Sequence, residues 1–356
     1  SSLAAVRALG DAGDRVVVTQ TRAESAQEPA AFLSRCTWQG RWIDGSCKDE
    51  AYADRLLSLL GTLDRPVLFC TGADTLAAVS RRRAEFAAVA DFLVAPPEVL
   101  DALNDKQQVH ERARALGIPV PDEFSGPPDR FPVVIKPHCG EKAGLKARDR
   151  YTIAHDADEF RTKYAAMQRW DDAPIVQEQV VGPGEGVDLL LGRDSELLCA
   201  LCHRRIREYP VTGGPSTCCV SFYDEELIAA AHRLLASFGF VGMAMVELKG
   251  GRVLEVNPRV WGSFPLTDRC GSPYTVLYAR AAAGEPVEYT PRDFRTDVKL
   301  RFLFNDGLAT LGYCKAGRLR EALGGVRDFF TVPEVLRRRD DMRAYRAYLK
   351  NSLKGR

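Results

Sequence analysis

Apolar and polar residues alternate most clearly between positions 243 and 263, where the pattern predicts a β-hairpin. Two apolar runs, each carrying one carboxylate, flank the sequence Lys-Gly-Gly-Arg at 249–252, which is typical of two strands joined by a tight turn. Because side chains alternate between the two faces of a strand, Glu255, Asn257 and Arg259 are expected to share one face. The hairpin therefore brings three polar side chains together.

The register of this hairpin decides whether Glu247 joins the polar face. A two-residue loop would place Glu247 opposite Leu254, whereas a three-residue loop with a glycine in the left-handed region would place it opposite Glu255. We predict the second arrangement. Two carboxylates and the amide of Asn257 would then form an all-oxygen site, which suits Mg²⁺ better than zinc. A surface hairpin with solvated charges is the alternative, and the hairpin alone does not decide between them.

The first 95 residues alternate between helix and strand patterns. We predict helices at 3–9, 49–60 and 75–90 and strands at 15–20 and 66–71. Such alternation implies a parallel sheet that is covered on both faces. Because an α/β unit usually begins with a strand, we expect a first strand upstream of Ser1. Residues 1–95 are therefore predicted to form an N-terminal α/β domain.

Beyond residue 95 the pattern changes to short strands, single helices and glycine-rich loops. The predicted helices include one that ends near 116 and others at 156–170, 224–238 and 274–283, the predicted strands lie at 132–137, 175–181, 187–191, 196–205 and 298–304, and a loop covers 210–217. The tail from residue 332 is basic and is predicted to be helical. We divide this part into 96–180 with a linker, 181–290 with the hairpin, and a partly helical C-terminal extension at 291–356.

Composition describes an ordinary soluble globular protein of two or three domains. The chain has 356 residues, of which 46% are hydrophobic and 27% charged, and its formal net charge is +1. A near-neutral balance gives no reason to expect a nucleic-acid partner. No apolar run approaches the ~20 residues of a membrane span, and the first residues do not look like a signal peptide. We therefore expect a cytoplasmic protein.

Ten cysteines in a chain of this length do not indicate a disulfide framework, and most are expected to be free and buried. The sequence Cys-Ala-Leu-Cys-His at 199–203 formally matches a haem attachment pattern. However, residues 197–201 form an apolar run without turn residues. We predict a strand there, with Cys199 and Cys202 on opposite faces, which argues against a haem or metal site.

Several charged residues gain meaning from their order along the chain. Lys106 stands near a helix start and Lys136 lies in Ile-Lys-Pro at a strand end; a glycine-rich loop, Gln-Glu-x-x-Val at 177–181 and the acids of the hairpin follow. Each feature alone is more often a solvated surface group. In this order, over about 91–286, the series resembles the ATP-grasp superfamily of carboxylate–amine ligases.

That resemblance implies a protein of mixed α/β and α+β class. The ATP-grasp fold would comprise an N-terminal parallel α/β domain, called the pre-ATP-grasp domain, and two α+β subdomains that enclose the nucleotide. It also implies ATP and Mg²⁺ as cofactors, with two metal ions and with Mn²⁺ as a substitute. Lys106 and Lys136 match the lysines that contact the nucleotide phosphates. Glu247, Glu255 and Asn257 match the Mg²⁺ ligands.

The resemblance also implies nucleotide contacts elsewhere. Glu178, with the backbone of Gln179 to Val181, matches the segment that holds adenine, Glu185 stands where many members place a carboxylate on the ribose, and Gly140 to Gly144 match the loop that closes over the triphosphate. The spelling Gly-Pro-Gly-Glu-Gly at 182–186 departs from the commonest family pattern, which weakens the assignment of Glu185.

Three arginines are candidates for catalysis. Arg259, on the face of Glu255, is placed to hold the substrate carboxylate or the oxyanion of a tetrahedral intermediate. Several relatives carry an arginine two residues before the first metal-binding acid, where this chain has Met245. Arg205 and Arg207 are therefore further candidates, on one face of a strand beside the triphosphate; a solvated edge strand is the alternative.

The implied activity is ATP-dependent ligation. A carboxylate is activated as an acylphosphate, with ADP and phosphate as products, and is joined to an amine of an amino acid or related small molecule. A lid is needed because water would hydrolyse the acylphosphate. An acceptor other than an amine, or a nucleotide-binding regulatory module without turnover, remains open. The implied partners are a small-molecule carboxylate and amine, with no nucleic acid and no membrane, and a homodimer is compatible with this assignment.

Overall fold

A six-stranded antiparallel sheet forms the centre of the protein. The computed structural model describes residues 1–24, 27–138, 145, 149, 151–211 and 214–354. The sheet has the order β10-β9-β6-β7-β8-β11. Its strands are β6 (Gly184–Leu191), β7 (Leu197–Glu208), β8 (Ser216–Phe222), β9 (Gly242–Lys249), β10 (Arg252–Asn257) and β11 (Lys299–Arg301). The predicted loop 210–217 was thus too long, because β8 already begins at Ser216.

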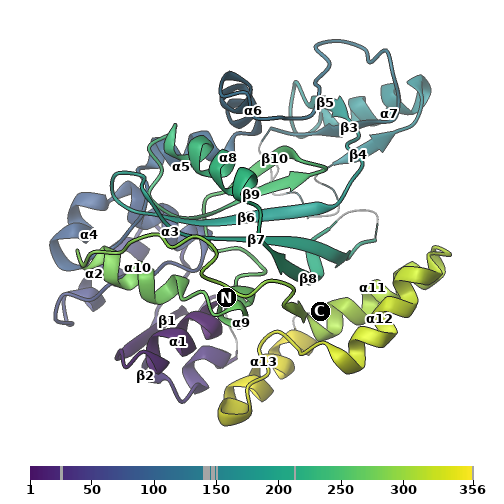
Figure 1. The fold of residues 1–356 in the computed structure, drawn as a ribbon. Helices are drawn as coiled ribbons and strands as arrows, with labels where there is room; N and C mark the ends of the chain where they lie inside the picture. The colour runs from purple at the N-terminus through teal and green to yellow at the C-terminus, as the bar shows by residue number, and fades with distance from the viewer. Residues whose placement is uncertain (25–26, 139–144, 146–148, 150, 212–213, 355–356) are drawn as a thin grey trace.

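Both faces of the sheet are buried, because side chains from alternate positions of its central strands enter separate cores. One core lies against α5 (Pro97–Asn104), α6 (Lys106–Ala115) and α8 (Glu225–Ala236), and the other against α9 (Pro265–Cys270) and α10 (Tyr274–Ala282), as Figure 1 shows. Cys199 belongs to one core and Cys202 to the other. The prediction that these thiols lie on opposite faces of a strand is therefore confirmed. The cysteines of the described residues are all free, and most are buried.

The N-terminal part is less regular than its sequence pattern suggested. It contains α1 (Ser2–Asp11), β1 (Val16–Thr21), the 3-10 turn η1 (Ala30–Leu33), β2 (Thr37–Ile43), α2 (Tyr52–Leu60), α3 (Ala73–Arg81) and α4 (Arg83–Val89). Strands β1 and β2 pair in parallel, as expected for an α/β unit. The predicted strand 66–71 is wrong, since it forms one parallel bridge, Val67 to Asp91. Pro66 has no N–H to donate to a longer ladder.

The predicted helix 75–90 is also wrong as a single element. Helices α3 and α4 meet at Arg82, whose backbone leaves the helical region at φ −115° and ψ 35°. The guanidinium of Arg82 donates to Asp54 on α2 at 2.6 Å and also pairs with Glu85. The helix thus breaks at the residue that bonds to α2, and the local helix propensity of the sequence does not predict that break.

A second, smaller sheet lies to one side of the main sheet (Figure 1). Its order is β4 (Thr152–Ala154), β3 (Val133–Lys136) and β5 (Ile175–Glu178), all antiparallel, and α7 (Ala157–Met167) packs on it. Asp156 caps α7 by accepting hydrogen bonds from two backbone amides of its first turn. Strand β5 ends at Glu178, three residues earlier than predicted.

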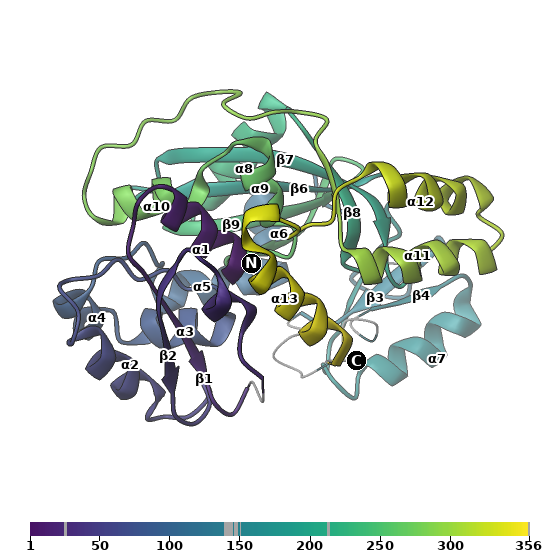
Figure 2. The same ribbon diagram turned by 90° about the horizontal axis from the view of Figure 1, so that it is seen from below.

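The C-terminal residues form a helical hairpin and a return to the N-terminus. Helices α11 (Leu303–Lys315) and α12 (Leu319–Thr331) pack against each other, and the short turn η3 (Arg339–Asp341) leads into α13 (Met342–Lys354), which lies against η1 (Figure 2). The predicted strand 298–304 is only β11, because α11 begins at Leu303. Among the described residues, no helix combines the length and the apolar character needed to span a membrane.

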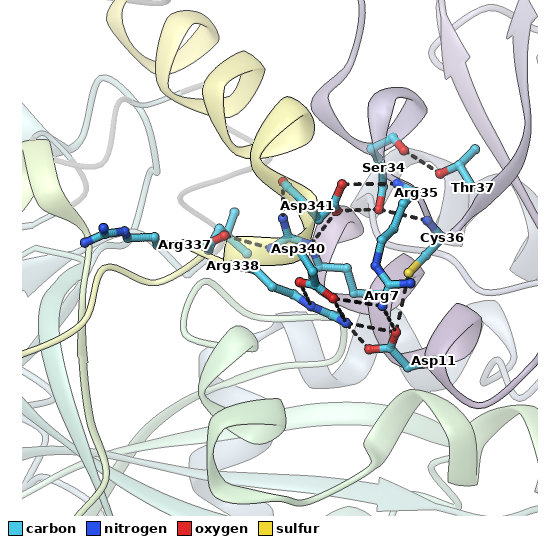
Figure 3. Close-up of polar contacts among 12 residues, drawn as sticks. Arg7, Asp11, Ser34, Arg35, Cys36, Thr37, Arg337, Arg338, Asp340 and Asp341 are labelled. Carbon is cyan, nitrogen blue, oxygen red and sulfur yellow. Dashed lines mark hydrogen bonds and ion pairs between the residues drawn. The ribbon is translucent and has the colours of Figure 1, made fainter.

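A buried ion pair fixes this return. Arg7 of α1 donates to Asp341 at 2.9 Å and to the backbone oxygen of Leu336 at 2.7 Å, and both charged groups are almost fully buried. Figure 3 shows Ser34 and the amide of Arg35 donating to the same carboxylate. The buried carboxylate of Asp341 therefore ties the C-terminal part of the chain to the N-terminal part, which supplies all of these donors.

The hairpin of β9 and β10 has the predicted register but reaches it differently. Lys249 pairs with Arg252, so Gly250 and Gly251 form a two-residue turn, with φ of 51° and 76°. Both values are positive, as a type I′ turn requires. The register then shifts at Leu254, a β-bulge, so that Glu255 lies opposite Glu247. The predicted facing pair is confirmed, and the predicted three-residue loop is wrong.

We expect substitutions in this turn to separate backbone strain from steric clash. Alanine at Gly251 would meet nothing within 4 Å, so Gly251→Ala should lower the free energy of unfolding by ~1–2 kcal/mol through positive φ alone. Gly250→Ala should cost more, because its Cβ would lie 2.7 Å from the backbone oxygen of Val181. Urea unfolding of both variants measures the difference. Equal losses would contradict the close approach at Gly250.

Candidate active site

Two carboxylates face each other across the hairpin, and each meets a cation from another element. The Oε2 atom of Glu247 lies 2.7 Å from Nη2 of Arg205, which comes from β7. The Oε2 atom of Glu255 lies 3.3 Å from Nζ of Lys106, the first residue of α6. Like charges placed this close repel each other unless cations offset them. The cations of β7 and α6 supply that compensation.

Asn257 and Arg259 continue the same polar face. The Nδ2 atom of Asn257 donates to Glu255 at 3.4 Å, and its Oδ1 atom accepts from Arg259 at 3.5 Å. Arg259 also donates to the backbone oxygen of Val260 at 3.2 Å. The three polar residues that the alternation predicted on one face are thus adjacent in space.

The two carboxylates differ in their affinity for a proton. Burial raises the pKa of Glu247 above its ordinary value, and the charge of Glu255 adds to that rise while Arg205 opposes it. Burial acts in the same direction on Glu255, but Lys106 and Lys136 outweigh it and hold the pKa of Glu255 below its ordinary value. A divalent cation between them would favour the ionised form of both.

Lys136 is the most unusual charge of the site. It is the last residue of β3 and only 7% exposed. Among the residues that the structure describes, its ammonium has no hydrogen-bond or ion-pair partner. Burial, with the nearby charge of Lys106, lowers the pKa of Lys136 to about 8, although the carboxylates of the site oppose this. A buried, unpaired cation is unfavourable, so an anion is expected to bind beside it.

The charges together indicate a site for an anion that arrives with a divalent cation. Lys106, Lys136, Arg205 and Arg259 outnumber the two hairpin carboxylates. Within the described part of the chain, no group of three or more His, Cys, Asp or Glu side chains is placed to hold a metal. Two carboxylates and the amide oxygen of Asn257 offer a mixed oxygen set instead, which fits Mg²⁺ or Mn²⁺ when a ligand or water supplies further oxygens.

Solved structures of biotin carboxylases are among those that share this architecture. The chain superposes on the biotin carboxylase domain of 2-oxoglutarate carboxylase from Hydrogenobacter thermophilus with a TM-score of 0.63 and 13% identity, covering 84% of this chain and 71% of that one. The values for biotin carboxylase from Campylobacter jejuni are 0.63, 12%, 84% and 72%. The chain has the ATP-grasp fold. At such identities the likeness extends to the fold alone. No protein-family model matches the sequence, and no curated protein matches it either.

Within the ATP-grasp fold of this chain, a buried histidine holds the hairpin bulge. The Nε2 atom of His110 lies 3.0 Å from the backbone oxygen of Leu254, the bulged residue, and its Nδ1 atom lies 2.5 Å from Glu123. The two neighbours lie on different ring nitrogens, so the imidazole bridges Glu123 and the bulge. His110 follows Lys106 by one turn of α6. One helix therefore supplies a cation to Glu255 and fixes the backbone beside it.

The sequence held a signal for His110 that the motif comparison did not use. Residues four apart share a helix face, so a histidine four positions after Lys106 points to the same side of α6. A second buried histidine had no such signal. His203 lies 2.9 Å from Asp188 and 3.0 Å from Ser263, and these partners are separated along the chain. This network ties the segment after the hairpin to β6 and β7.

The predicted adenine segment lies where β5 ends. The Oε1 atom of Glu178 accepts from the amide of Asp122 at 3.1 Å and lies 3.2 Å from Nε of Arg252. The amide of Gln179 donates to the oxygen of Pro132 at 3.3 Å. Val181 is 87% exposed, while its backbone approaches the hairpin turn at Gly250. The segment thus touches the hairpin that carries the carboxylates.

Two predicted residues do not join the carboxylates. Glu185 pairs with Arg204 at 2.8 Å, and strand alternation places it on the opposite face of the sheet from Glu247. Arg207 was predicted on one face with Arg205, but the register of β7 shifts between them, and its guanidinium binds Asp306 and Asp328. Arg207 therefore serves the C-terminal hairpin. Gly140 and Gly144 lie outside the described residues.

We expect His110→Leu to loosen the bulge specifically. The change leaves the buried oxygen of Leu254 and the Glu123 carboxylate without their partner, which should cost about 2–4 kcal/mol. Hydrogen exchange of a peptide covering 250–258 should then accelerate relative to one covering 187–191. His232→Leu is the matched control, because it removes a single hydrogen bond to the oxygen of Ser195 at 2.9 Å, away from the hairpin. Unchanged exchange at 250–258 in the His110 variant would refute the positioning role.

Proposed function

We propose that the protein is an ATP-dependent ligase that activates a carboxylate as an acylphosphate and joins it to an amine of an amino acid or related small molecule. The observation that carries this proposal is the buried ammonium of Lys136, which has no partner among the described residues and lies beside Lys106 and the facing carboxylates Glu247 and Glu255. Cations for phosphate oxygens and oxygens for a metal then lie side by side, which is the requirement of phosphoryl transfer.

The groups of the site divide into three roles. Lys106 and Lys136 would hold the phosphates of ATP, and Glu247, Glu255 and Asn257 would hold Mg²⁺. The metal would supply neutralisation of the charge on the transferred phosphoryl group. Adenine would bind at the segment from Glu178 to Val181. Glu185 is not assigned to the ribose, because it pairs with Arg204 on the face of the sheet opposite Glu247.

Arg205 and Arg259 are proposed to act on the substrate. Arg205 is bound to Glu247, and a metal on that carboxylate would compete with it and release guanidinium donors for a carboxylate substrate. The carboxylate oxygen attacks the γ-phosphorus of ATP and ADP leaves; the amine then attacks the acyl carbon and phosphate leaves. Arg259 would stabilise the oxyanion that forms in the second step.

The fold neighbours support nucleotide and metal use and favour a second candidate. The Hydrogenobacter thermophilus domain was solved with MgADP, ADP and bicarbonate, and the Campylobacter jejuni enzyme with an ATP analogue. Bicarbonate also has an oxygen that can attack the γ-phosphorus of ATP. ATP-dependent carboxylation is therefore the second candidate, and it requires that ADP release depend on bicarbonate instead of an organic acid.

We expect ADP and phosphate, formed in equal amounts, when the protein is given Mg-ATP with matching carboxylate and amine substrates. Nucleotide release should be measured with a panel of amino acids, each with and without added bicarbonate. Glu247→Gln and Asn257→Ala should each lower kcat at least about 100-fold by weakening charge neutralisation. Glu226→Gln, an exposed change on α8, is the control. Release of AMP would overturn the mechanism, and unaffected turnover in both site variants would favour a module whose metal site is not catalytic.

Nucleotide affinity should fall as the pH rises through about 8. The ammonium of Lys136 loses its charge there in the free protein, since burial has lowered its pKa to about 8, whereas bound phosphate favours the charged form. Calorimetry of ADP binding in EDTA from pH 6.5 to 9.5 should therefore show a lower affinity at alkaline pH. Binding there should be accompanied by proton uptake by the complex. Lys136→Arg keeps its charge and should give a flatter profile. The same decline in both proteins would exclude Lys136 as the cause.

A further inference from the structure

The C-terminal helical hairpin of α11 and α12 exposes its largest apolar side chains. Figures 1 and 2 show this hairpin projecting from the edge of the main sheet beside β8. Six of its side chains are between 53 and 81% exposed, namely Leu311, Leu319, Leu323, Val326, Phe329 and Phe330. Such a concentration on one element is unusual for a protein surface and marks an interaction site.

The side of the hairpin that faces the protein is small and polar by contrast. Its core consists of Ala309, Tyr313 and Ala322, and a Cβ on Gly325 would lie 2.1 Å from Oγ1 of Thr310. An amphipathic helix normally turns its apolar stripe toward the protein. Helix α12 turns Leu319, Leu323, Val326 and Phe330 toward the solvent, whereas the guanidinium of Arg301 lies 4.7 Å from the ring centre of Phe329.

A buried ion cluster anchors the hairpin in this orientation. Arg207 of β7 donates to Asp306 on α11 at 2.8 and 2.9 Å and to Asp328 on α12 at 2.8 Å. Thr217 of β8 donates to Asp306 at 3.1 Å. These groups fix which sides of α11 and α12 face inward, because rotating either helix would leave a buried charge without a partner.

The spacing of the exposed residues is that of a helix–helix seam. Leu319, Leu323, Val326 and Phe330 follow one another at intervals of four, three and four residues, the interval of a coiled-coil stripe. The stripe is also nearly symmetrical about its midpoint. If two copies lie antiparallel, Leu323 faces the partner's Val326 and Leu319 faces the partner's Phe330, so each large side chain meets a complementary one.

We propose that this stripe is the contact between two copies of the chain, whose hairpins form an antiparallel four-helix bundle about a two-fold axis. This inference is independent of the proposed reaction. The antiparallel direction sets each leucine of the stripe against a different apolar side chain of the partner, whereas a parallel pairing sets each position of the stripe against its own copy.

The exposed area is on the scale of a stable interface. The two phenylalanines alone, at 53 and 81% exposure, leave on the order of 250 Å² in water if a whole aromatic side chain presents roughly 200 Å². Four aliphatic side chains, each more than half exposed, bring the surface to several hundred Å². A standard interface buries about 800 Å² per partner, so the six exposed side chains of the hairpin together would form the apolar centre of such a contact.

The test is a charge exchange across the proposed seam, followed by sedimentation velocity of the full chain. Leu323→Glu and Val326→Lys should each weaken self-association at least about 100-fold, since each buries an unpaired charge. An equimolar mixture of the two variants should associate again, because the new carboxylate of one chain faces the new ammonium of the other. A parallel seam would not show this recovery, since it pairs each position with itself.

Leu353→Glu is the matched control, since Leu353 is a leucine of α13 with 58% exposure. It should associate like the unmodified chain. The circular-dichroism spectrum should be the same for all variants, because each substituted side chain is exposed in one chain and its change leaves the fold intact. A monomeric unmodified protein at micromolar concentration, association that survives the single substitutions, loss of association in the control, or no recovery on mixing would each overturn the proposal.

Discussion

Two carboxylates that face each other across one hairpin impose the charge arrangement of the whole site. Glu247 and Glu255 repel each other, and both side chains are partly buried, so cations from outside the hairpin are needed to offset their charges. Arg205 arrives from β7, Lys106 from α6 and Lys136 from the smaller sheet. These three elements are therefore placed so that each brings a cation close to the two acids.

This arrangement leaves the site incomplete in a particular way. Arg205 and Lys106 already pair with the acids, whereas Lys136 has no partner within the described residues. A metal on the acids would displace their present cations, and an anion would then satisfy all the positive groups together. Metal and anion are therefore expected to support each other's binding, which is the property that an enzyme acting on a metal–nucleotide complex needs.

Local alternation predicted the hairpin, the polar face and most long elements, because these depend on residues that are neighbours in sequence. The errors arise where a distant partner decides the outcome. The bulged Leu254 is hydrogen-bonded through its backbone oxygen to His110, which lies 144 positions away. The two-residue turn without that bulge would have separated the acids. The break at Arg82 involves Asp54 of another helix. Arg207 left the predicted site for Asp306 and Asp328, 99 and 121 positions onward. Periodicity carries no information about such partners.

Strand β7 carries three arginines with three different destinations. Arg204 binds Glu185 on one face, Arg205 binds Glu247 on the other, and Arg207, beyond the register shift, binds the acids of α11 and α12. A slip of one residue would send every side chain to the opposite face, and each guanidinium would lose its carboxylate at once. The apolar residues of β7 alternate between two cores, so a slip would move each of them into the other core and weaken its packing. The three ion pairs therefore form together or not at all, which fixes the register of β7. That register in turn positions both the site and the C-terminal hairpin.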